Sequence, residues 1–125
     1  MEIKEGLRYT EDHEWIYIED DQAVVGISDY AQQELGDLVF VNLPEVDDEI
    51  EAGEAFADVE SVKAVSDVLA PVGGTVVEIN EQILDEPEMI NNSPYEAWFI
   101  KLSDYGDIDE LMTADEYKTY LEGLE

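Results

Sequence analysis

Short β-strand patterns fill the first four-fifths of the chain, and they constrain its fold more than any other feature. The runs are rich in β-branched and aromatic residues, and several alternate apolar with polar side chains, as half-buried strands do. They cover Glu14 to Glu19, Ala23 to Ile27, Asp37 to Leu43, Ala55 to Val62, Ser66 to Ala70, Thr75 to Ile79 and Ala97 to Leu102. We therefore expect a mainly β protein.

Two segments depart from the strand pattern and predict helices. In the first, Ser28 can cap the N-terminus of a short internal helix, which Gly36 can end. In the second, Thr113 and Glu116 form a capping-box pattern. The apolar residues that follow at helical spacing are Tyr117, Tyr120, Leu121 and Leu124. We expect this C-terminal helical extension to occupy about 104–125.

Two seven-residue segments in different runs resemble each other. Gly36 to Asn42 reads GDLVFVN and Gly74 to Asn80 reads GTVVEIN, so both follow the order Gly, any residue, aliphatic, Val, any residue, aliphatic, Asn. Coincidence within a β-rich composition is one explanation. The other is a repeat that relates two similar halves by an approximate two-fold, as in a two-sheet sandwich or flattened barrel. Lys63 would then lie in the connection between the halves.

The composition excludes several classes of function. The chain has no cysteine, which excludes disulfides, thiolate metal sites, Fe–S clusters and a cysteine nucleophile. The single histidine, His13, leaves no multi-histidine metal site. Apolar runs are far shorter than the ~20 residues of a membrane helix, and the N-terminus has no apolar signal-peptide region. We expect one cytoplasmic, soluble domain over residues 1–125, without a metal.

The charge balance is strongly acidic, with 34 acidic against 5 basic residues and a formal net charge of −29 at pH 7. Such a surface repels phosphate backbones and anionic membranes, so neither nucleic acid nor a membrane is an expected partner. Self-repulsion destabilises the compact chain in dilute buffer, but at ~1 M salt the Debye length falls to ~3 Å and screens it. The acids are dispersed along the chain, which favours adaptation to a salt-rich cytoplasm over an acidic binding tract.

Lys63 is the residue that most clearly suggests a chemical role. It lies in a tight turn over Val62 to Val65, at the tip of a predicted hairpin. No Asn or Gly supplies the positive φ that a two-residue hairpin turn prefers, so turn propensity does not explain these residues. A lysine there projects a four-carbon stem whose primary amine can form an amide with a carboxylic acid cofactor. The alternative is an ordinary exposed lysine, although the chain has only four lysines.

The sequence around Lys63 resembles the lipoyl-attachment segment of glycine cleavage H proteins. The matching residues are Glu60 to Ala64 (ESVKA), Ser66, Asp67, Ala70, Pro71, Val72 and Gly74. Further matches, in the same order as in the family, are His13 to Trp15 (HEW), Val25 to Tyr30 (VGISDY), Ala31, Gln32, Leu35, Gly36, Asp37 and Val39 to Val46 (VFVNLPEV). Lipoyl domains of 2-oxo acid dehydrogenases usually have Asp before the lysine, and biotin carriers usually flank it with Met. Val62 fits neither pattern.

The resemblance implies a fold and a site. The fold is the two-sheet, flattened barrel-sandwich of lipoyl and biotinyl carriers, with a short internal helix and a C-terminal helix. The site is Lys63, as the point of covalent lipoate attachment. The hairpin residues that an attaching enzyme would recognise are Glu60, Ser61, Val62 and Ala64. Glu14 and Asp67 match positions near the cleft in which the family's arm settles, and their charge would attract a protonated aminomethyl group.

The resemblance also implies a monomeric carrier rather than an enzyme. A pyridoxal-phosphate glycine decarboxylase (P protein) would load the arm with an aminomethyl group. An aminomethyltransferase (T protein) would pass the one-carbon unit to a tetrahydropterin, and dihydrolipoyl dehydrogenase (L protein) would reoxidise the arm. A lipoate-attaching enzyme is the fourth expected partner.

Two other functions are alternatives. A lipoyl or octanoyl carrier paralogue, serving lipoate synthesis or another lipoate-dependent pathway, would share every motif. An independent hydrolase is disfavoured, because Ser61 and Ser66 have no histidine nearby in sequence to activate them. We expect His13 to be a structural hydrogen-bonding residue rather than a catalytic base.

Overall fold

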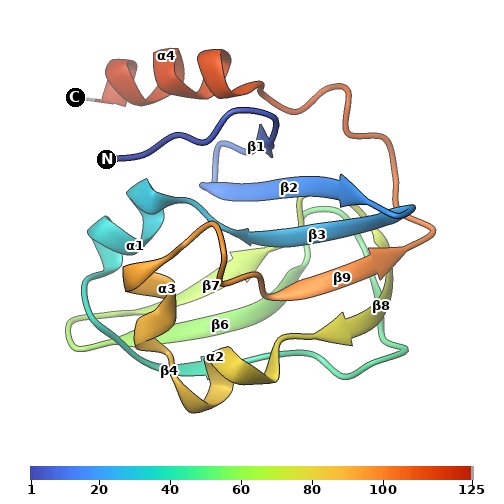
Figure 1. The fold of residues 1–125 in the computed structure, drawn as a ribbon, viewed down its shortest axis with the longest axis horizontal. Helices are drawn as coiled ribbons and strands as arrows, with labels where there is room; N and C mark the ends of the chain where they lie inside the picture. The colour runs from blue at the N-terminus through green and yellow to red at the C-terminus, as the bar shows by residue number, and fades with distance from the viewer. Residues whose placement is uncertain (125) are drawn as a thin grey trace.

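The computed structural model describes residues 1–124, which form two antiparallel β-sheets with helices around them (Figure 1). In order across the larger sheet, the strands are β1 (Arg8–Tyr9), β2 (Glu14–Glu19), β3 (Gln22–Ile27), β9 (Ile100–Ser103), β8 (Gly74–Ile79) and β5 (Glu49–Ile50). The smaller sheet consists of β4 (Leu38–Asn42), β6 (Ala55–Ser61) and β7 (Val65–Leu69), in that order. Every strand run expected from the sequence overlaps one of these strands, and the prediction of a mainly β, two-sheet fold is confirmed.

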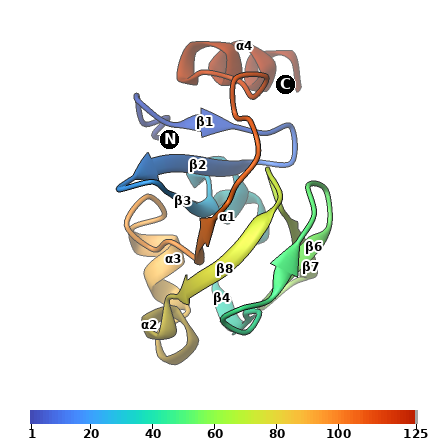
Figure 2. The ribbon, with the colours of Figure 1, turned by 90° about the vertical axis from the view of Figure 1, so that its right-hand side faces the viewer.

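The two sheets pack face to face and share one apolar core, but they do not close into a barrel (Figure 2). Buried side chains of the larger sheet include Val25, Val76, Ile100 and Leu102, and those of the smaller sheet include Val41, Phe56, Val59 and Val68. Along β6, Ala57 and Val59 are buried while Glu60 is exposed, as the alternation predicts. The two similar seven-residue segments contribute β4 to one sheet and β8 to the other.

The C-terminal helix α4 (Ala114–Leu124) covers the β1 edge of the larger sheet (Figure 1). Its capping box is confirmed: the Thr113 N–H donates to the Glu116 carboxylate at 2.9 Å, and the Glu116 N–H donates to the Thr113 hydroxyl at 3.3 Å. The helix begins later than the expected 104, because residues 104–113 form a loop that bridges back to β1. Glu125 lies outside the described residues.

Three short helices lie beside the smaller sheet. The helix α1 (Asp29–Leu35) begins at Ser28, whose hydroxyl accepts a hydrogen bond from the Ala31 N–H at 3.2 Å, and this predicted helix is confirmed. The helices α2 (Glu81–Asp85) and α3 (Glu88–Asn92) contact β4 and were not expected. Each buries a single side chain and is too short to show a helical period. Over residues 1–124, the helices all lack the length and apolar character needed to cross a membrane.

Candidate functional site

Lys63 is exposed in the turn that joins β6 to β7, at the tip of a hairpin that reaches the left edge of the molecule in Figure 1. The buried hydroxyl of Ser61 organises this turn. It accepts hydrogen bonds from the N–H groups of Lys63 (3.2 Å) and Ala64 (3.0 Å) and donates to the Ala64 carbonyl (3.2 Å). None of the described residues in this turn has a positive φ. Hydrogen bonds to the Ser61 hydroxyl thus stabilise this turn, whereas two-residue hairpin turns usually rely on the positive φ of a glycine or asparagine.

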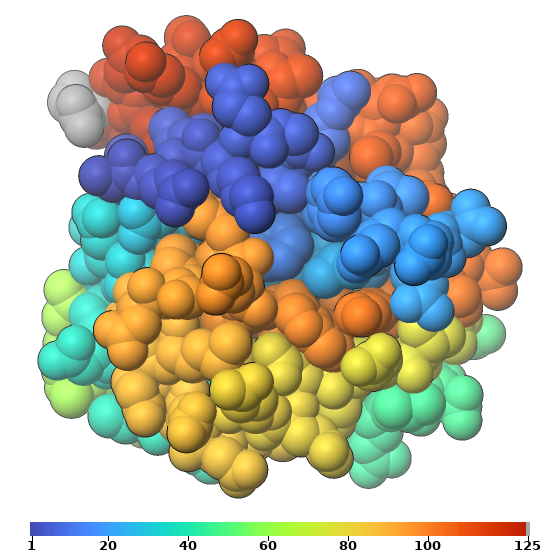
Figure 3. Space-filling view, viewed as in Figure 1, coloured from blue at the N-terminus to red at the C-terminus, as the bar shows by residue number. Residues whose placement is uncertain are grey.

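The hairpin tip rests on the connector between α1 and β4, residues 36–38. The Val62 N–H donates to the Asp37 carbonyl at 3.0 Å. Gly36 ends α1 with a φ of 83°, and a Cβ atom at this position would lie 3.2 Å from Cε of Lys63. Glycine therefore both adopts the left-handed conformation and leaves room for the lysine stem. The Lys63 side chain runs along the C-terminal end of α1, and Figure 3 shows the light-green hairpin against the cyan α1 region.

Asn91 of α3 holds this connector from the other side. Its Nδ2 donates to the Gly36 carbonyl at 2.8 Å and to Gln32 Oε1 at 3.0 Å, and its Oδ1 accepts from the Leu38 N–H at 2.9 Å. Sequence reasoning missed Asn91 because nothing in the local pattern distinguishes it from its neighbour Asn92. Only the fold brings α3 next to residues 36–38.

A cavity of about 170 Å³, here called the acidic cleft, lies between the α1 end of the larger sheet and the β6–β7 pair. Its ionisable lining is Asp12, His13, Glu14, Glu34 and Asp67, and its apolar lining includes Ile27, Leu35, Val59 and Val68. The structure thus brings Glu14 and Asp67 into one cleft, although they are far apart in the sequence. Leu35, which lines the cleft, is the residue before Gly36, beside which the Lys63 stem lies.

The two acids expected at the cleft differ in their surroundings. Glu14 is only 3% exposed, and its carboxylate accepts a hydrogen bond of 2.7 Å from the Thr10 hydroxyl. Burial raises the pKa of Glu14 to about 7, with a smaller contribution from Asp12, while the Thr10 hydrogen bond opposes the rise. Asp67 is exposed. Of the four acids that line the cleft, Glu14 is therefore the buried one, with a pKa near neutral pH, whereas Asp67 is exposed.

His13 joins the C-terminal helix to the start of α1. Its Nδ1 lies 2.8 Å from the Tyr117 hydroxyl, which lies 2.8 Å from the Ser28 hydroxyl that caps α1. Burial lowers the pKa of His13, although the nearby charges of Asp12 and Glu34 oppose this change. A neutral histidine held by a tyrosine in this way is a structural element. It links α4 to the helix on which Lys63 rests.

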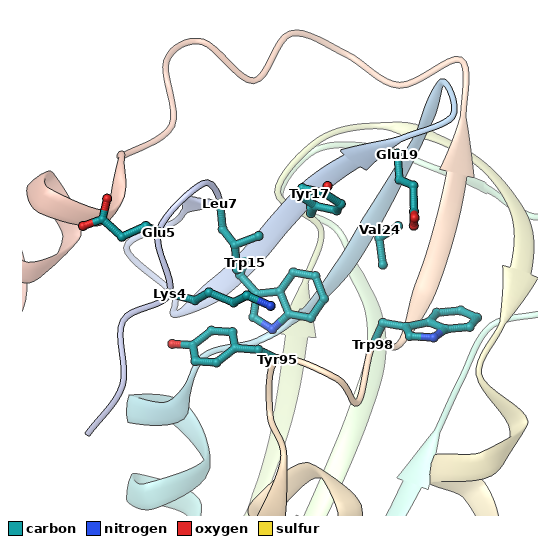
Figure 4. A pocket seen from close by; sticks show the side chains of 9 residues that line it. All are labelled: Lys4, Glu5, Leu7, Trp15, Tyr17, Glu19, Val24, Tyr95 and Trp98. Atoms are coloured by element: carbon teal, nitrogen blue, oxygen red, sulfur yellow. The ribbon is translucent and has the colours of Figure 1, made fainter.

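A second cavity, of about 420 Å³, is drawn in Figure 4, and Lys63 is not among the residues that line it. Aromatic rings form much of its wall, namely those of Trp15, Tyr17, Tyr95 and Trp98. Trp15 follows Glu14 on β2, so strand alternation places the two side chains on opposite faces of the sheet. None of the lining residues belongs to β6 or β7. Within residues 1–124, no cluster of three or more histidine and acidic side chains is arranged to hold a metal ion.

The predicted hairpin residues have different exposures. Glu60 and Ala64 are exposed, and 71% of Val62 is accessible. Ser61 is only 6% exposed, because its hydroxyl is used inside the turn. Ser61 thus shapes the hairpin, whereas the other three residues are displayed on its surface.

Comparisons with known proteins agree with this arrangement. The family model described as glycine cleavage H-protein matches residues 7–123. Curated relatives named glycine cleavage system H protein include those of Lachnoclostridium phytofermentans (57% identical, 97% of this chain and 96% of the relative) and Halothermothrix orenii (54% identical, all of both chains). A crystal structure of a glycine cleavage system H protein from Mycobacterium marinum superposes with a TM-score of 0.89, at 42% identity over 95% of this chain and 98% of that one. The resemblance found in the sequence is confirmed, and the chain belongs to the glycine cleavage H-protein family.

Proposed function

We propose that this chain carries a lipoyl group on Lys63 and serves as the shuttle of a glycine cleavage system. The observation that carries the proposal is the setting of Lys63, exposed at a hairpin tip whose turn is fixed by the Ser61 hydroxyl. Among residues 1–124, the only ion pair joins Lys101 to Glu78, at 3.7 Å. In a chain with 34 acidic residues, a lysine that no carboxylate holds is available to an acylating enzyme.

The acidic cleft fits the attached group. The Lys63 stem already lies along Gly36, one residue from Leu35 in the cleft. The apolar lining residues Ile27, Leu35, Val59 and Val68 suit a hydrocarbon chain, and the acids suit an amine. When bound at Lys63, a lipoyl group supplies a dithiolane that accepts an aminomethyl group and is later reoxidised.

Glu14 and Asp67 are the groups in the cleft that interact with the positive charge of an aminomethyl group on the arm. An amine that is protonated near neutral pH favours the ionised form of a nearby carboxyl, so its arrival lowers the pKa of Glu14 from its value of about 7. Glu14 then becomes a carboxylate paired with the cation inside a cleft that restricts water. Asp67 adds a charge on the exposed side.

The chain itself supplies placement and protection rather than catalysis. His13, the only histidine, is neutral and has Nδ1 against the Tyr117 hydroxyl, so it is poorly placed to act as a general base on the arm. The partners of the shuttle are glycine decarboxylase, aminomethyltransferase, dihydrolipoyl dehydrogenase and a lipoate-attaching enzyme. Tethering keeps the reactive group at a high local concentration for each partner without tight docking.

Intact mass of protein from its own cells tests the proposal. The wild type and a Lys118→Arg control, altered at an exposed lysine of α4, should both carry one lipoyl increment that maps to Lys63. The Lys63→Arg variant should lack it and should fail in reconstituted glycine cleavage. An unmodified Lys63 in cells with active lipoylation, or an increment on another lysine, would refute the proposal.

A further inference from the structure

The outer face of the larger sheet carries the cavity of about 420 Å³ drawn in Figure 4, here called the aromatic cavity. Strand alternation places Trp15 and Tyr17 on this face of β2, whereas Ile16 between them points into the core. Tyr95 and Trp98 come from the segment just before β9. Both tryptophans of the chain therefore line one cavity, together with two tyrosines.

Polar contacts and close packing hold two of these rings in place. Nε1 of Trp15 donates a hydrogen bond of 3.1 Å to the Pro94 carbonyl. The indole of Trp15 lies over Gly26, its partner on β3, where a Cβ atom would come within 2.5 Å of Cζ2. The Tyr95 hydroxyl donates to the Glu2 carbonyl at 2.7 Å. The cavity is therefore formed without a ligand, as small-molecule sites usually are.

The rings are arranged to receive positive charge. The ring centres of Trp15 and Tyr95 are 6.3 Å apart. A cation above the gap between them can thus lie within the ~6 Å over which a ring attracts it. Nζ of Lys101 lies 4.8 Å from the centre of the Trp98 ring and also pairs with Glu78. Lys101 does not line the cavity, so this contact helps to hold the indole and leaves the cavity itself free.

The charged residues that line the aromatic cavity are one base and two acids. In Figure 4 the side chain of Lys4 extends from the N-terminal segment toward Trp15, and Glu5 and Glu19 are exposed at the rim. A simple anion would meet the two acids, and a simple cation would meet Lys4. A ligand that carries both charges avoids both repulsions when its carboxylate pairs with Lys4 and its cation lies against the rings.

We propose that the aromatic cavity binds a small zwitterion that has a quaternary ammonium group and a carboxylate, the chemistry of an N-trimethylated amino acid. The methyl groups lie against the indoles of Trp15 and Trp98, and the carboxylate accepts a hydrogen bond from the Lys4 amine. Trp15 and Glu14 are on opposite faces of β2, so this site and the acidic cleft lie on opposite sides of the larger sheet. The proposed site is therefore independent of the lipoyl arm.

A ligand in the aromatic cavity would join three parts of the chain. Lys4 belongs to the segment before β1, Trp15 to β2, and Trp98 to the segment before β9. Binding to the folded chain alone stabilises it by mass action, in proportion to how far the site is filled. Spectroscopic changes caused by a bound ligand saturate, whereas the general stabilisation by excluded osmolytes keeps growing with their concentration. This difference separates a specific site from a solvent effect.

The test titrates the full-length chain with glycine betaine, at a fixed KCl concentration, and follows tryptophan fluorescence. Because Trp15 and Trp98 are the only tryptophans, the signal reports on the aromatic cavity. We expect a change that saturates at millimolar betaine. The carbon isostere of betaine, in which a tert-butyl group replaces the trimethylammonium group, should bind about tenfold more weakly. Equal affinities for betaine and this isostere, or a signal that never saturates, would overturn the proposal.

Variants locate the site. Trp98→Leu should weaken betaine binding about tenfold, with Trp15 as the remaining reporter. Lys4→Gln should weaken binding of betaine but not of choline, which has the trimethylammonium group and lacks the carboxylate. Phe40→Leu is the matched aromatic control, because Phe40 is 49% exposed on β4, where a bulge leaves it on the surface beside Val39. The control should bind betaine as the wild type does, and thermal melting should show all three variants folded.

Two results would contradict the assignment of these residues. One is a loss of betaine affinity in Phe40→Leu as large as in Trp98→Leu, and the other is an equal loss of choline and betaine affinity in Lys4→Gln. The lipoylated and unlipoylated chains should bind betaine equally. The outcome at this site thus leaves the proposed function untouched, and an unmodified Lys63 would not alter the outcome here.

Discussion

The carbonyl oxygen of Asp37 accepts a hydrogen bond of 3.0 Å from the N–H of Val62, and this contact ties the tip of the lysine hairpin to the end of α1. Asn91 bonds to the backbone on both sides of Asp37, through the Gly36 carbonyl and the Leu38 N–H. Asn91 of α3 thus holds the connector, and the connector holds the hairpin tip, so that Asn91 helps to fix the position of Lys63 without touching it.

The first prediction concerns Asn91. Asn91→Ala leaves the Leu38 N–H and the Gly36 carbonyl without their partner, so the free energy of unfolding should fall by about 1–3 kcal/mol. The neighbouring, exposed Asn92 provides a matched control, because Asn92→Ala should stay within about 0.5 kcal/mol of the wild type. Urea denaturation measures both. Hydrogen exchange at the Val62 amide should accelerate only in Asn91→Ala, and unchanged protection there would contradict the role of Asn91.

The second prediction is a pH dependence of stability that arises from Glu14. Its pKa is about 7 in the folded protein against an ordinary value of 4.5, so between these pH values the folded state binds more protons than the unfolded state. The contribution of Glu14 to stability is therefore present at low pH and is lost as pH rises from 4.5 to 7. At 1.36 kcal/mol per pKa unit, the full change is about 3 kcal/mol.

Glu14→Gln isolates this effect, because it keeps an oxygen for the Thr10 hydroxyl and cannot ionise. The difference in unfolding free energy between wild type and variant should fall steadily from pH 4.5 to pH 7. His13 has a lowered pKa and makes stability rise with pH in the same region, but this contribution is present in both proteins and cancels. Parallel pH profiles for the two proteins would show that Glu14 is not buried in this way.

The third prediction concerns the acidic cleft. If Glu14 and Asp67 hold an aminomethyl cargo away from water, Glu14→Gln and Asp67→Asn should each speed its loss from the isolated, loaded protein. The exposed Asp67 should contribute only about 0.2–1 kcal/mol, and less in molar salt. Glu19→Gln is the control, because Glu19 is an exposed acid on the same strand as Glu14 but outside the cleft. Equal rates of loss in all four proteins would remove these acids from the site.

The fourth prediction is that salt stabilises the fold. The net charge is −29, and the described residues contain one ion pair, Lys101 with Glu78, so screening removes far more repulsion than attraction. The melting temperature should rise from dilute buffer to molar KCl. At pH 4, where many of the carboxyls are protonated, the rise should be smaller. A melting temperature independent of salt at neutral pH would refute the screening argument.

The strands and two helices could be predicted because their signals are local. Alternation marks β6, and the caps Ser28 and Thr113 lie next to the helices that they begin. The strands β1 and β5 have two residues each, and α2 and α3 five each, which is too few for a periodic pattern.

Site features that depend on distant segments were less predictable. The resemblance suggested Glu14 and Asp67, and the structure places both in one cleft. The burial of Glu14 and the resulting rise in its pKa required the packing of β2 against the rest of the molecule. The role of Asn91 and the exposure of Val39 beside Phe40 required, respectively, the approach of α3 and the β4 bulge. Neither of these two features can be recognised from the local sequence.

The hydroxyl of Ser61 has a consequence for movement. Its hydrogen bonds hold the turn in place of a flexible glycine, so the backbone that carries Lys63 contains no hinge. All movement of the arm must therefore come from rotation about the bonds of the Lys63 side chain and of the group attached to it. Every partner therefore meets an arm with the same fixed origin and the same radius, and the volume that the arm sweeps stays small. A glycine in this turn would enlarge that volume and dilute the arm at each of its destinations.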